Sequence, residues 1–236
     1  MRILDVVILA GGKGTRLSEE TTIKPKPMVM IGNKPILWHI IKIYQKYGYK
    51  NFYVATGYKS NHIKNYFKKN KIKGITLNVI YTGIETQTGG RIFKLKNYLN
   101  NKKFLMTYGD GLSNVNIKKL IDFHEKKRAD ITMTAVRPPA RWGVIKITNG
   151  TVNKFEEKNI KNEGWINGGF FVVGPDLFKK FRFKSNTIFE VDILPKMIKS
   201  SKLSAYKHDG FWQCMDTLRD KKTLNRLYRQ GAPWIK

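Results

Sequence analysis

The stretch most capable of chemistry combines a run of glycines with cations near the N-terminus. Residues 8–17 read Ile-Leu-Ala-Gly-Gly-Lys-Gly-Thr-Arg-Leu, and residues 24–27 read Lys-Pro-Lys-Pro. Glycines let the backbone approach a ligand and turn its N–H groups inward, so such a turn can cradle phosphate oxygens. Arg16 would add a planar guanidinium group with several N–H donors, and Lys26 would add a compact ammonium charge. An ordinary glycine turn would explain the glycines alone, but the added cations favour a phosphate site.

Two familiar phosphate motifs fit this stretch poorly. A Walker A loop needs a hydroxyl residue directly after its lysine, and here Gly14 follows Lys13. A dinucleotide fingerprint would need a third glycine where Leu17 stands, and no acidic residue lies between Glu20 and Glu85 to bind a ribose. Neither motif explains the segment.

Two aspartates are candidates for binding a metal ion. Asp110 lies between two glycines, directly after the apolar run 104–108. A carboxylate there can bind Mg²⁺ that bridges phosphates, because magnesium takes one or two carboxylates plus substrate oxygens. Asp216 is a plausible second ligand. The alternatives are a turn aspartate that stabilises its own loop for Asp110 and an N-cap of the last helix for Asp216.

Three further segments could recognise a sugar or a base. Glu157-Lys158 and the segment 165–169 (Trp-Ile-Asn-Gly-Gly) suit a sugar and its phosphate, although Glu157-Lys158 could equally be a weak surface pair at a strand end. The segment 88–91 (Thr-Gly-Gly-Arg) would allow close approach of the backbone to a flat base. A turn that starts a helix explains it as well.

The chain shows no pattern typical of a protein nucleophile. Its four histidines lack metal-ligand spacing, no serine or cysteine sits in a nucleophile elbow, and Cys214 is expected to pack. One reaction on phosphates needs no such group, because an ionised sugar 1-phosphate can attack the α-phosphorus of a nucleoside triphosphate directly. The protein would then contribute alignment, cations and Mg²⁺.

The elements that must hold these residues alternate between strand and helix. Apolar runs predict strands at 6–10, 52–56, 75–81 and 104–108, and periodic segments predict helices from 34 and at 61–69, 91–99 and 117–128. This alternation predicts an α/β, Rossmann-like, mostly parallel sheet with helices on both faces. Ligands bind beyond the carboxyl ends of such strands, and polar segments do follow them, at 11–16, 57–59, 82–90 and 109–111.

After Asp130 the character of the chain changes. Short strands split by turn residues are expected at 131–136, 144–147, 152–155 and 170–173, which predicts an antiparallel addition over the sheet. A helix near 189–199, a strand at 203–206 and a helix at 217–230 follow. With no linker composition or internal repeat, residues 1–236 are expected to form a single domain.

Composition narrows the class of partner. The 236 residues carry a net charge of +28, but the lysines are scattered and no RNA-binding, zinc-finger or zipper signature accompanies them. We therefore expect no specific nucleic-acid function, and polyphosphate substrates would explain part of the charge. One cysteine rules out a disulfide within the chain, and no apolar run suits a signal peptide or a membrane span, so we expect a cytoplasmic protein.

Several longer phrases resemble one enzyme family. They are the GGxGTRL…KPKP segment at the N-terminus and the residues 17–21, 34–40, 88–91, 108–111, 165–172, 208–213, 215–221 and 232–234. Together they cover nearly the whole chain and resemble the sugar-1-phosphate nucleotidylyltransferases, most closely the members that use CTP and glucose 1-phosphate. The resemblance implies a GT-A-like nucleotidyltransferase fold and a transfer from CTP to a hexose 1-phosphate, giving a CDP-sugar and pyrophosphate for surface polysaccharide.

The resemblance also implies roles for particular residues. Arg16, Lys26 and Asp110 would be catalytic, and Asp110 with Asp216 would bind Mg²⁺. The nucleotide would be bound by Leu9, Ala10, Gly11, Gly12, Gly14, Thr15, Arg16, Lys26, Thr88, Gly89, Arg91 and Asp110. The sugar phosphate would be bound by Gly143, Glu157, Lys158, Asn167 and Gly168.

The chain departs from the family pattern in three places. Only residues 68–74 remain where the family carries a polar insertion that contributes to subunit contacts, so a homo-oligomer is one expectation among several. Asn159 replaces the usual proline after Glu-Lys, and 138–143 reads Pro-Pro-Ala-Arg-Trp-Gly instead of Pro-Pro-Gly-Arg-Phe-Gly. Two alternatives therefore stay open: an enzyme of this family with another sugar phosphate or nucleotide, and an inactive, regulatory sugar-nucleotide-binding protein.

Overall fold

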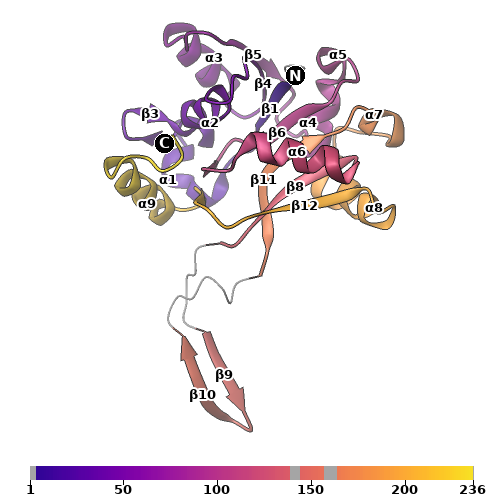
Figure 1. Cartoon of the computed structure of the whole chain (residues 1–236). Helices are drawn as coiled ribbons and strands as arrows, with labels where there is room; N and C mark the ends of the chain where they lie inside the picture. The colour runs from indigo at the N-terminus through magenta and orange to yellow at the C-terminus, as the bar shows by residue number, and fades with distance from the viewer. Residues whose placement is uncertain (1–3, 139–143, 157–163, 236) are drawn as a thin grey trace.

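A seven-stranded sheet forms the centre of the molecule, as the computed structural model shows for residues 4–138, 144–156 and 164–235 (Figure 1). Its strands are β1 (Asp5–Ala10), β4 (Asn51–Thr56), β5 (Thr76–Tyr81), β6 (Phe104–Tyr108), β8 (Ile131–Val136), β11 (Ile166–Val173) and β12 (Leu203–His208). They lie in the order β12-β8-β11-β6-β1-β4-β5. Every neighbouring pair is parallel except the two that involve β11, which runs antiparallel to both β6 and β8.

Helices cover both faces of this sheet. One face is covered by α2 (Ile36–Gln45), α3 (Ser60–Lys69), α6 (Ile117–Lys127) and α9 (Leu218–Arg229). The other is covered by α4 (Thr88–Lys94), α5 (Lys96–Leu99), α7 (Leu177–Lys180), the π-helical turn η4 (Phe189–Ile193) and α8 (Leu194–Lys199). The remaining short turns are η1 (Thr15–Leu17), α1 (Ser18–Thr21) and η2 (Lys26–Met28). The predicted α/β class with a mostly parallel sheet is confirmed.

The two apolar layers follow from the strand period. Along β1, Val6 and Ile8 pack into the layer beneath α2, whereas Val7 and Leu9 pack into the layer beneath α4. Successive side chains of a strand point to opposite faces, so a strand covered on both sides needs an uninterrupted apolar run. The run at 6–10 meets that requirement.

Three two-stranded pairs lie outside the main sheet. They are β2 (Met30–Ile31) with β3 (Lys34–Pro35), β7 (Gly111–Ser113) with β13 (Trp212–Cys214), and β9 (Val144–Thr148) with β10 (Thr151–Glu156). Figure 1 shows the β9–β10 hairpin extending away from the body of the molecule. The β7–β13 pair is the one that matters for the site described below.

Two strands of the expected antiparallel addition, β8 and β11, lie within the sheet rather than over it, and the other two, β9 and β10, form the separate hairpin. β8 and β11 extend the sheet beyond β6, and β12 is parallel to β8. The reason is that β11 is apolar on both faces, with Phe170 packing into one layer and Phe171 into the other. A strand laid over a sheet would have buried one face only.

Two predicted helices are interrupted. The segment 91–99 divides into α4 and α5 at Leu95, whose φ of −92° and ψ of −2° leave the helical range. The segment 189–199 begins with the wider turn η4 before α8. Among the described residues, no helix is both long and apolar enough to cross a bilayer.

Candidate active site

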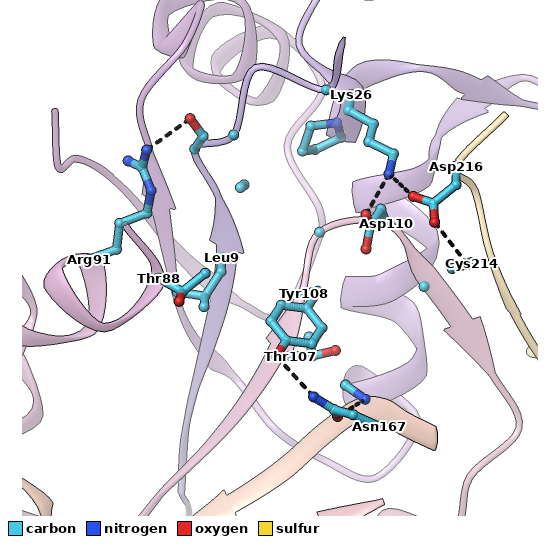
Figure 2. Close-up of a pocket in the computed structure, with 18 of the residues that line it drawn as sticks. Leu9, Lys26, Thr88, Arg91, Thr107, Tyr108, Asp110, Asn167, Cys214 and Asp216 are labelled. Atoms are coloured by element: carbon cyan, nitrogen blue, oxygen red, sulfur yellow. Dashed lines mark hydrogen bonds and ion pairs between the residues drawn. The ribbon is translucent and has the colours of Figure 1, made fainter. Parts of the chain in front are cut away.

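A cleft of about 560 Å³ opens beyond the carboxyl ends of β1 and β6, where open α/β sheets bind ligands (Figure 2). Its size is typical of small-molecule sites. Most of the residues predicted for substrate or metal binding line it: Leu9, Ala10, Gly11, Gly12, Gly14, Arg16, Lys26, Thr88, Arg91, Asp110, Asn167, Gly168 and Asp216. Segments far apart in the sequence thus meet in one cavity.

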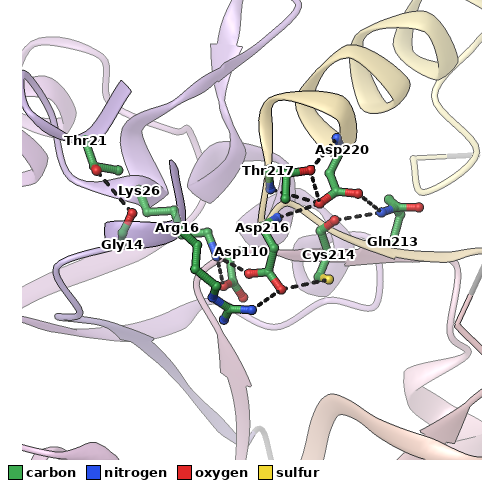
Figure 3. Close-up of polar contacts among 10 residues, drawn as sticks. All are labelled: Gly14, Arg16, Thr21, Lys26, Asp110, Gln213, Cys214, Asp216, Thr217 and Asp220. Atoms are coloured by element: carbon green, nitrogen blue, oxygen red, sulfur yellow. Dashed lines mark hydrogen bonds and ion pairs between the residues drawn. The ribbon is translucent and has the colours of Figure 1, made fainter. Parts of the chain in front are cut away.

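The glycine-rich loop after β1 folds back on itself. Gly14 has a φ of 68°, in the left-handed region that favours glycine. A Cβ atom there would lie 3.0 Å from the side chains of both Lys26 and Thr21. The Thr21 hydroxyl donates to the carbonyl oxygen of Gly14 at 3.1 Å (Figure 3). The loop is therefore held closely against the start of η2, which carries Lys26.

Lys26 lies between the two candidate metal-binding carboxylates (Figure 3). Its ammonium donates to Asp110 Oδ2 at 2.7 Å and to Asp216 Oδ1 at 2.6 Å. The side chain is only 10% exposed. Burial alone would lower the pKa of Lys26, but the charges and hydrogen bonds of the two carboxylates outweigh it and raise that pKa. Lys26 is therefore charged at neutral pH.

The pairing of β7 with β13 brings the two carboxylates together. Gly111 faces Cys214 across this pair, and the Met215 N–H donates to the Asp110 carbonyl oxygen at 2.9 Å. Asp110 precedes one strand and Asp216 follows the other. The antiparallel pairing therefore places their side chains at the same end of the ladder.

Asp216 is free of the capping role considered above. Thr217 is the N-cap of α9 and forms a capping box with Asp220. Asp220 Oδ2 accepts from the backbone N–H of Asp216 at 3.0 Å, which fixes that residue's backbone. The Asp216 carboxylate consequently faces Lys26, and it also accepts from Arg16 Nη1 at 2.8 Å.

Arg91 has a different place from the one its predicted role suggests. Its side chain is buried, and the guanidinium donates to backbone carbonyl oxygens and one hydroxyl: Gly11 O, Thr56 O, Thr82 Oγ1, Gly83 O and Ile84 O. Burial lowers the pKa of Arg91, and its two terminal nitrogens, Nη1 and Nη2, donate to these five acceptors. Figure 2 shows it reaching the loop after β1. Arg91 thus fixes the wall of the cleft by joining the loop after β1, the end of β4 and the loop after β5.

A few predicted residues lie elsewhere. Thr15 is exposed in η1, outside the cleft lining, and Gly89 packs against Thr187, which a Cβ atom at Gly89 would approach to 2.7 Å. Gly143, Glu157 and Lys158 lie outside the described residues, so their predicted roles stay predictions.

Sequence reasoning missed three residues at the opposite side of the cleft, two that line it and one, Glu190, that lies behind the wall. The Trp212 ring donates from Nε1 to the carbonyl oxygen of Gly168 at 2.8 Å, and the Tyr108 hydroxyl accepts from Asn167 Nδ2 at 3.1 Å. Glu190, on η4, accepts from that same Tyr108 hydroxyl. Tyr108 directly precedes the Gly-Asp-Gly segment and could have been found by its position. No local signal pointed to Glu190.

Cys214 borders the cleft without acting as a nucleophile. Burial and the neighbouring carboxylates raise the pKa of its thiol to about 12, and its Sγ lies 3.7 Å from Asp216 Oδ2. A neutral thiol is a poor nucleophile. The expectation that Cys214 packs agrees with this environment.

The donor set fits a magnesium ion. Magnesium prefers one or two carboxylates plus phosphate oxygens and water, and Asp110 with Asp216 supply two convergent carboxylates at a cleft open to a phosphate ligand. The described residues contain no group of three or more His, Cys, Asp or Glu that could form an all-protein cage. These two residues therefore allow a magnesium site in which the protein supplies two carboxylates and the substrate supplies the remaining oxygen ligands.

Comparison with known proteins assigns the chain to a family. The family model described as "Nucleotidyl transferase" matches residues 5–227, and the chain belongs to that family. Members generally use a divalent metal ion and take a nucleoside triphosphate and a sugar phosphate as substrates.

Two curated relatives match along nearly their full length. The probable glucose-1-phosphate cytidylyltransferase of Bacillus subtilis is 40% identical, covering 97% of both chains. The glucose-1-phosphate cytidylyltransferase of Salmonella typhimurium is 41% identical, covering 98% of both chains. Among solved structures, HddC from Yersinia pseudotuberculosis superposes with a TM-score of 0.76 at 26% identity, over 95% of this chain and 99% of that one.

Proposed function

We propose that this protein transfers a cytidylyl group from CTP to a hexose 1-phosphate, α-D-glucose 1-phosphate in the first instance, to give CDP-glucose and pyrophosphate. The observation that carries this proposal is the meeting of the glycine-rich loop, Lys26 and the Asp110–Asp216 pair in one cleft. The two relatives at about 40% identity bear the name of this activity.

The chemistry requires no covalent enzyme intermediate. An oxygen of the sugar phosphate attacks the α-phosphorus of CTP in line, a new P–O bond forms, and the bond from the α-phosphorus to the bridging oxygen breaks. Pyrophosphate leaves with the electron pair. Negative charge builds up on the leaving group, and the enzyme's task is to align the reactants and stabilise that charge.

Each part of the cleft has a role in this scheme. The loop 11–16 binds the triphosphate with its backbone N–H groups, and Arg16 and Lys26 neutralise phosphate charge. Asp110 and Asp216 would hold the Mg²⁺ ion. When bound, that ion screens the phosphate charges from the approaching nucleophile.

The acceptor sugar would occupy the opposite wall. Asn167 and Gly168 line the cleft there, and the resemblance adds Gly143, Glu157 and Lys158 as partners for the sugar and its phosphate. We also propose that the single domain acts in the cytoplasm. A homo-oligomer is a separate prediction, which light scattering coupled to size-exclusion chromatography would test.

The decisive experiment measures pyrophosphate release with each of the four nucleoside triphosphates against a panel of sugar 1-phosphates. We expect the highest kcat/KM for CTP with glucose 1-phosphate. GTP belongs in the panel because HddC was solved in complex with GMP-PN. A clear preference for another pair would replace the proposed substrates within the same family, and no turnover with any pair would favour a regulatory binding protein.

A further inference from the structure

Glu190 lies behind the wall of the cleft and holds one residue on each side of it. Its Oε2 accepts a hydrogen bond from Thr88 Oγ1 at 2.6 Å, and its Oε1 accepts one from the Tyr108 hydroxyl. Thr88 begins α4 and Tyr108 ends β6. Both side chains line the cleft, whereas Glu190 is half-buried and does not.

The carboxylate determines which way each hydroxyl points. An ionised carboxylate only accepts hydrogen bonds, so both Thr88 and Tyr108 must donate their single proton to it. The Thr88 oxygen also accepts from the backbone N–H of Phe189 at 2.8 Å. Thr88 therefore has one lone pair left and no donor. Any further partner of this hydroxyl must itself be a donor.

A second branch runs from Tyr108 to Asn167 (Figure 2). Because the Tyr108 proton is committed to Glu190, the phenol oxygen is an acceptor for Asn167 Nδ2 at 3.1 Å. Asn167 Oδ1 accepts from the Gly169 N–H at 2.9 Å, which fixes the orientation of the amide. One N–H of Asn167 then remains as a donor for a sugar hydroxyl or phosphate oxygen.

The surrounding packing keeps this network rigid. Gly169 has a φ of 79°, and a Cβ atom there would lie 2.5 Å from the Tyr108 ring. The Phe171 ring meets Tyr108 edge-on at 5.8 Å between centroids. Glu190 itself sits in the π-helical turn η4, a rare geometry that often occurs at functional sites.

From this geometry we infer that Glu190 is a positioning residue that orients the substrate-facing groups of both halves of the cleft, Thr88 on one side and Asn167, through Tyr108, on the other. The inference rests on the proposed function for the identity of the two ligands. It predicts that a single carboxylate supports recognition of both the nucleotide and the sugar phosphate, along two separable branches.

Three variants test the two branches. Thr88→Val should raise the KM for CTP and leave that for the sugar phosphate nearly unchanged, and Tyr108→Phe should do the reverse. Glu190→Gln, which is isosteric, should raise both, each by about 3- to 10-fold, the range of one hydrogen bond. Glu125→Gln is the matched control, since Glu125 is an exposed carboxylate on α6 that pairs with Lys103.

Double variants distinguish positioning from general destabilisation. In a Tyr108→Phe background, Glu190→Gln should have little further effect on the sugar-phosphate KM but should still raise the KM for CTP. Additive effects on both substrates would overturn the inference. So would a Glu190→Gln variant that loses thermal stability with both KM values unchanged.

Binding measurements separate this test from that of the proposed function. Titration calorimetry measures the affinity for CTP alone and for glucose 1-phosphate alone, without turnover. We expect Thr88→Val to weaken the binding of CTP, Tyr108→Phe to weaken that of glucose 1-phosphate, and Glu190→Gln to weaken both. An inactive wild type that binds both ligands would contradict the proposed transfer and leave the assignment of Glu190 standing. Unchanged affinities in Glu190→Gln would contradict the assignment of Glu190 in an active enzyme.

Discussion

At the scale of single residues, the charge balance around Lys26 is central to the site. One ammonium compensates two carboxylates, and those carboxylates are also the groups suited to a divalent cation. The lysine therefore has two roles: it keeps Asp110 and Asp216 together, and it supplies positive charge beside the glycine-rich loop. Removing it should affect both stability and catalysis.

For Lys26→Met we expect a loss of roughly 3 kcal/mol in the free energy of unfolding, because two close carboxylates lose their counter-charge. Added Mg²⁺ should restore more of the melting temperature in this variant than in wild type. We also expect kcat/KM to fall about 100- to 1,000-fold, as for other groups that stabilise transition-state charge.

Lys26→Arg is the matched control for charge. This variant should keep most of the stability but recover little activity, because a planar guanidinium group does not fit the space that a compact ammonium group occupies. Melting curves with and without Mg²⁺, alongside steady-state kinetics, provide the readouts. A Lys26→Met variant with unchanged melting and kinetics would contradict both roles.

A second prediction concerns acid stability. Burial alone would raise the pKa of Asp216, but its hydrogen bond to Lys26 and the charges of Lys26 and Arg16 outweigh this and lower that pKa below the ordinary value of an aspartate. A carboxyl whose pKa is lowered on folding contributes stability above its unfolded pKa and loses it as pH falls through the folded value. Wild type should therefore lose more melting temperature than Asp216→Asn when pH falls from about 5 to about 2.

The comparison between these two proteins isolates Asp216. Glu20, whose pKa is lowered chiefly by its hydrogen bond to Lys221, is present in both and cancels. Melting temperatures measured in steps of pH would give two curves that converge at low pH. Parallel curves would mean that the ion pair contributes nothing to folding.

At the scale of elements, two glycines of the loop after β1 are needed for different reasons, one for the backbone conformation and the other for the approach of a ligand. Gly14 needs its positive φ, and a Cβ atom there would press on Lys26 and Thr21 at 3.0 Å. Gly12 is exposed in the cleft, and a Cβ atom there would meet nothing within 4 Å. The folded protein thus requires a glycine at position 14, whereas at position 12 it has room for a methyl group when no ligand is bound.

We accordingly expect Gly14→Ala to reduce stability by roughly 1–2 kcal/mol, the cost of left-handed backbone for a residue with a Cβ atom. Gly12→Ala should leave the melting temperature unchanged but raise the KM for CTP several-fold, because the methyl group would keep phosphate oxygens from the backbone N–H groups. Thermal melts and CTP titrations on both variants test this. A normal KM in Gly12→Ala would place the triphosphate elsewhere.

At the scale of the whole molecule, the net charge of +28 should act on the encounter with anionic substrates. A strongly positive protein attracts nucleotides and phosphates over distances that salt shortens to about 10 Å at 0.1 M. The charge lies on scattered lysines rather than in the cleft alone, so its effect is on association more than on the chemical step.

We therefore expect kcat/KM for CTP to fall several-fold between about 20 and 200 mM KCl, while kcat at saturating substrate changes much less. Free Mg²⁺ must be held constant, and potassium acetate serves as a check against a specific chloride effect. A kcat/KM independent of ionic strength would show that the excess charge has no part in substrate capture.

Local patterns were sufficient for much of this protein. The strand β1, the glycine-rich loop after it and the helix α9 follow from residues close together in sequence, because strand period, left-handed glycine and helix capping are local properties. The α/β class followed from the alternation of such elements. Asp110 and Asp216 were candidate metal ligands from their positions in the sequence, with a turn and a helix cap as alternatives, and the resemblance favoured the metal-binding pair.

Tertiary structure alone decided the rest. Four features depend on contacts between segments that are distant in sequence. β11 enters the sheet between β6 and β8, and Lys26 joins both carboxylates. Arg91 joins the end of β4 to the loops after β1 and β5, and Glu190 supports both walls. The type of a side chain limits which partners it can bind. The sequence around Glu190, however, does not distinguish it from a glutamate on the exposed face of a helix. Its partner is set by which segments the packed core brings within hydrogen-bonding distance.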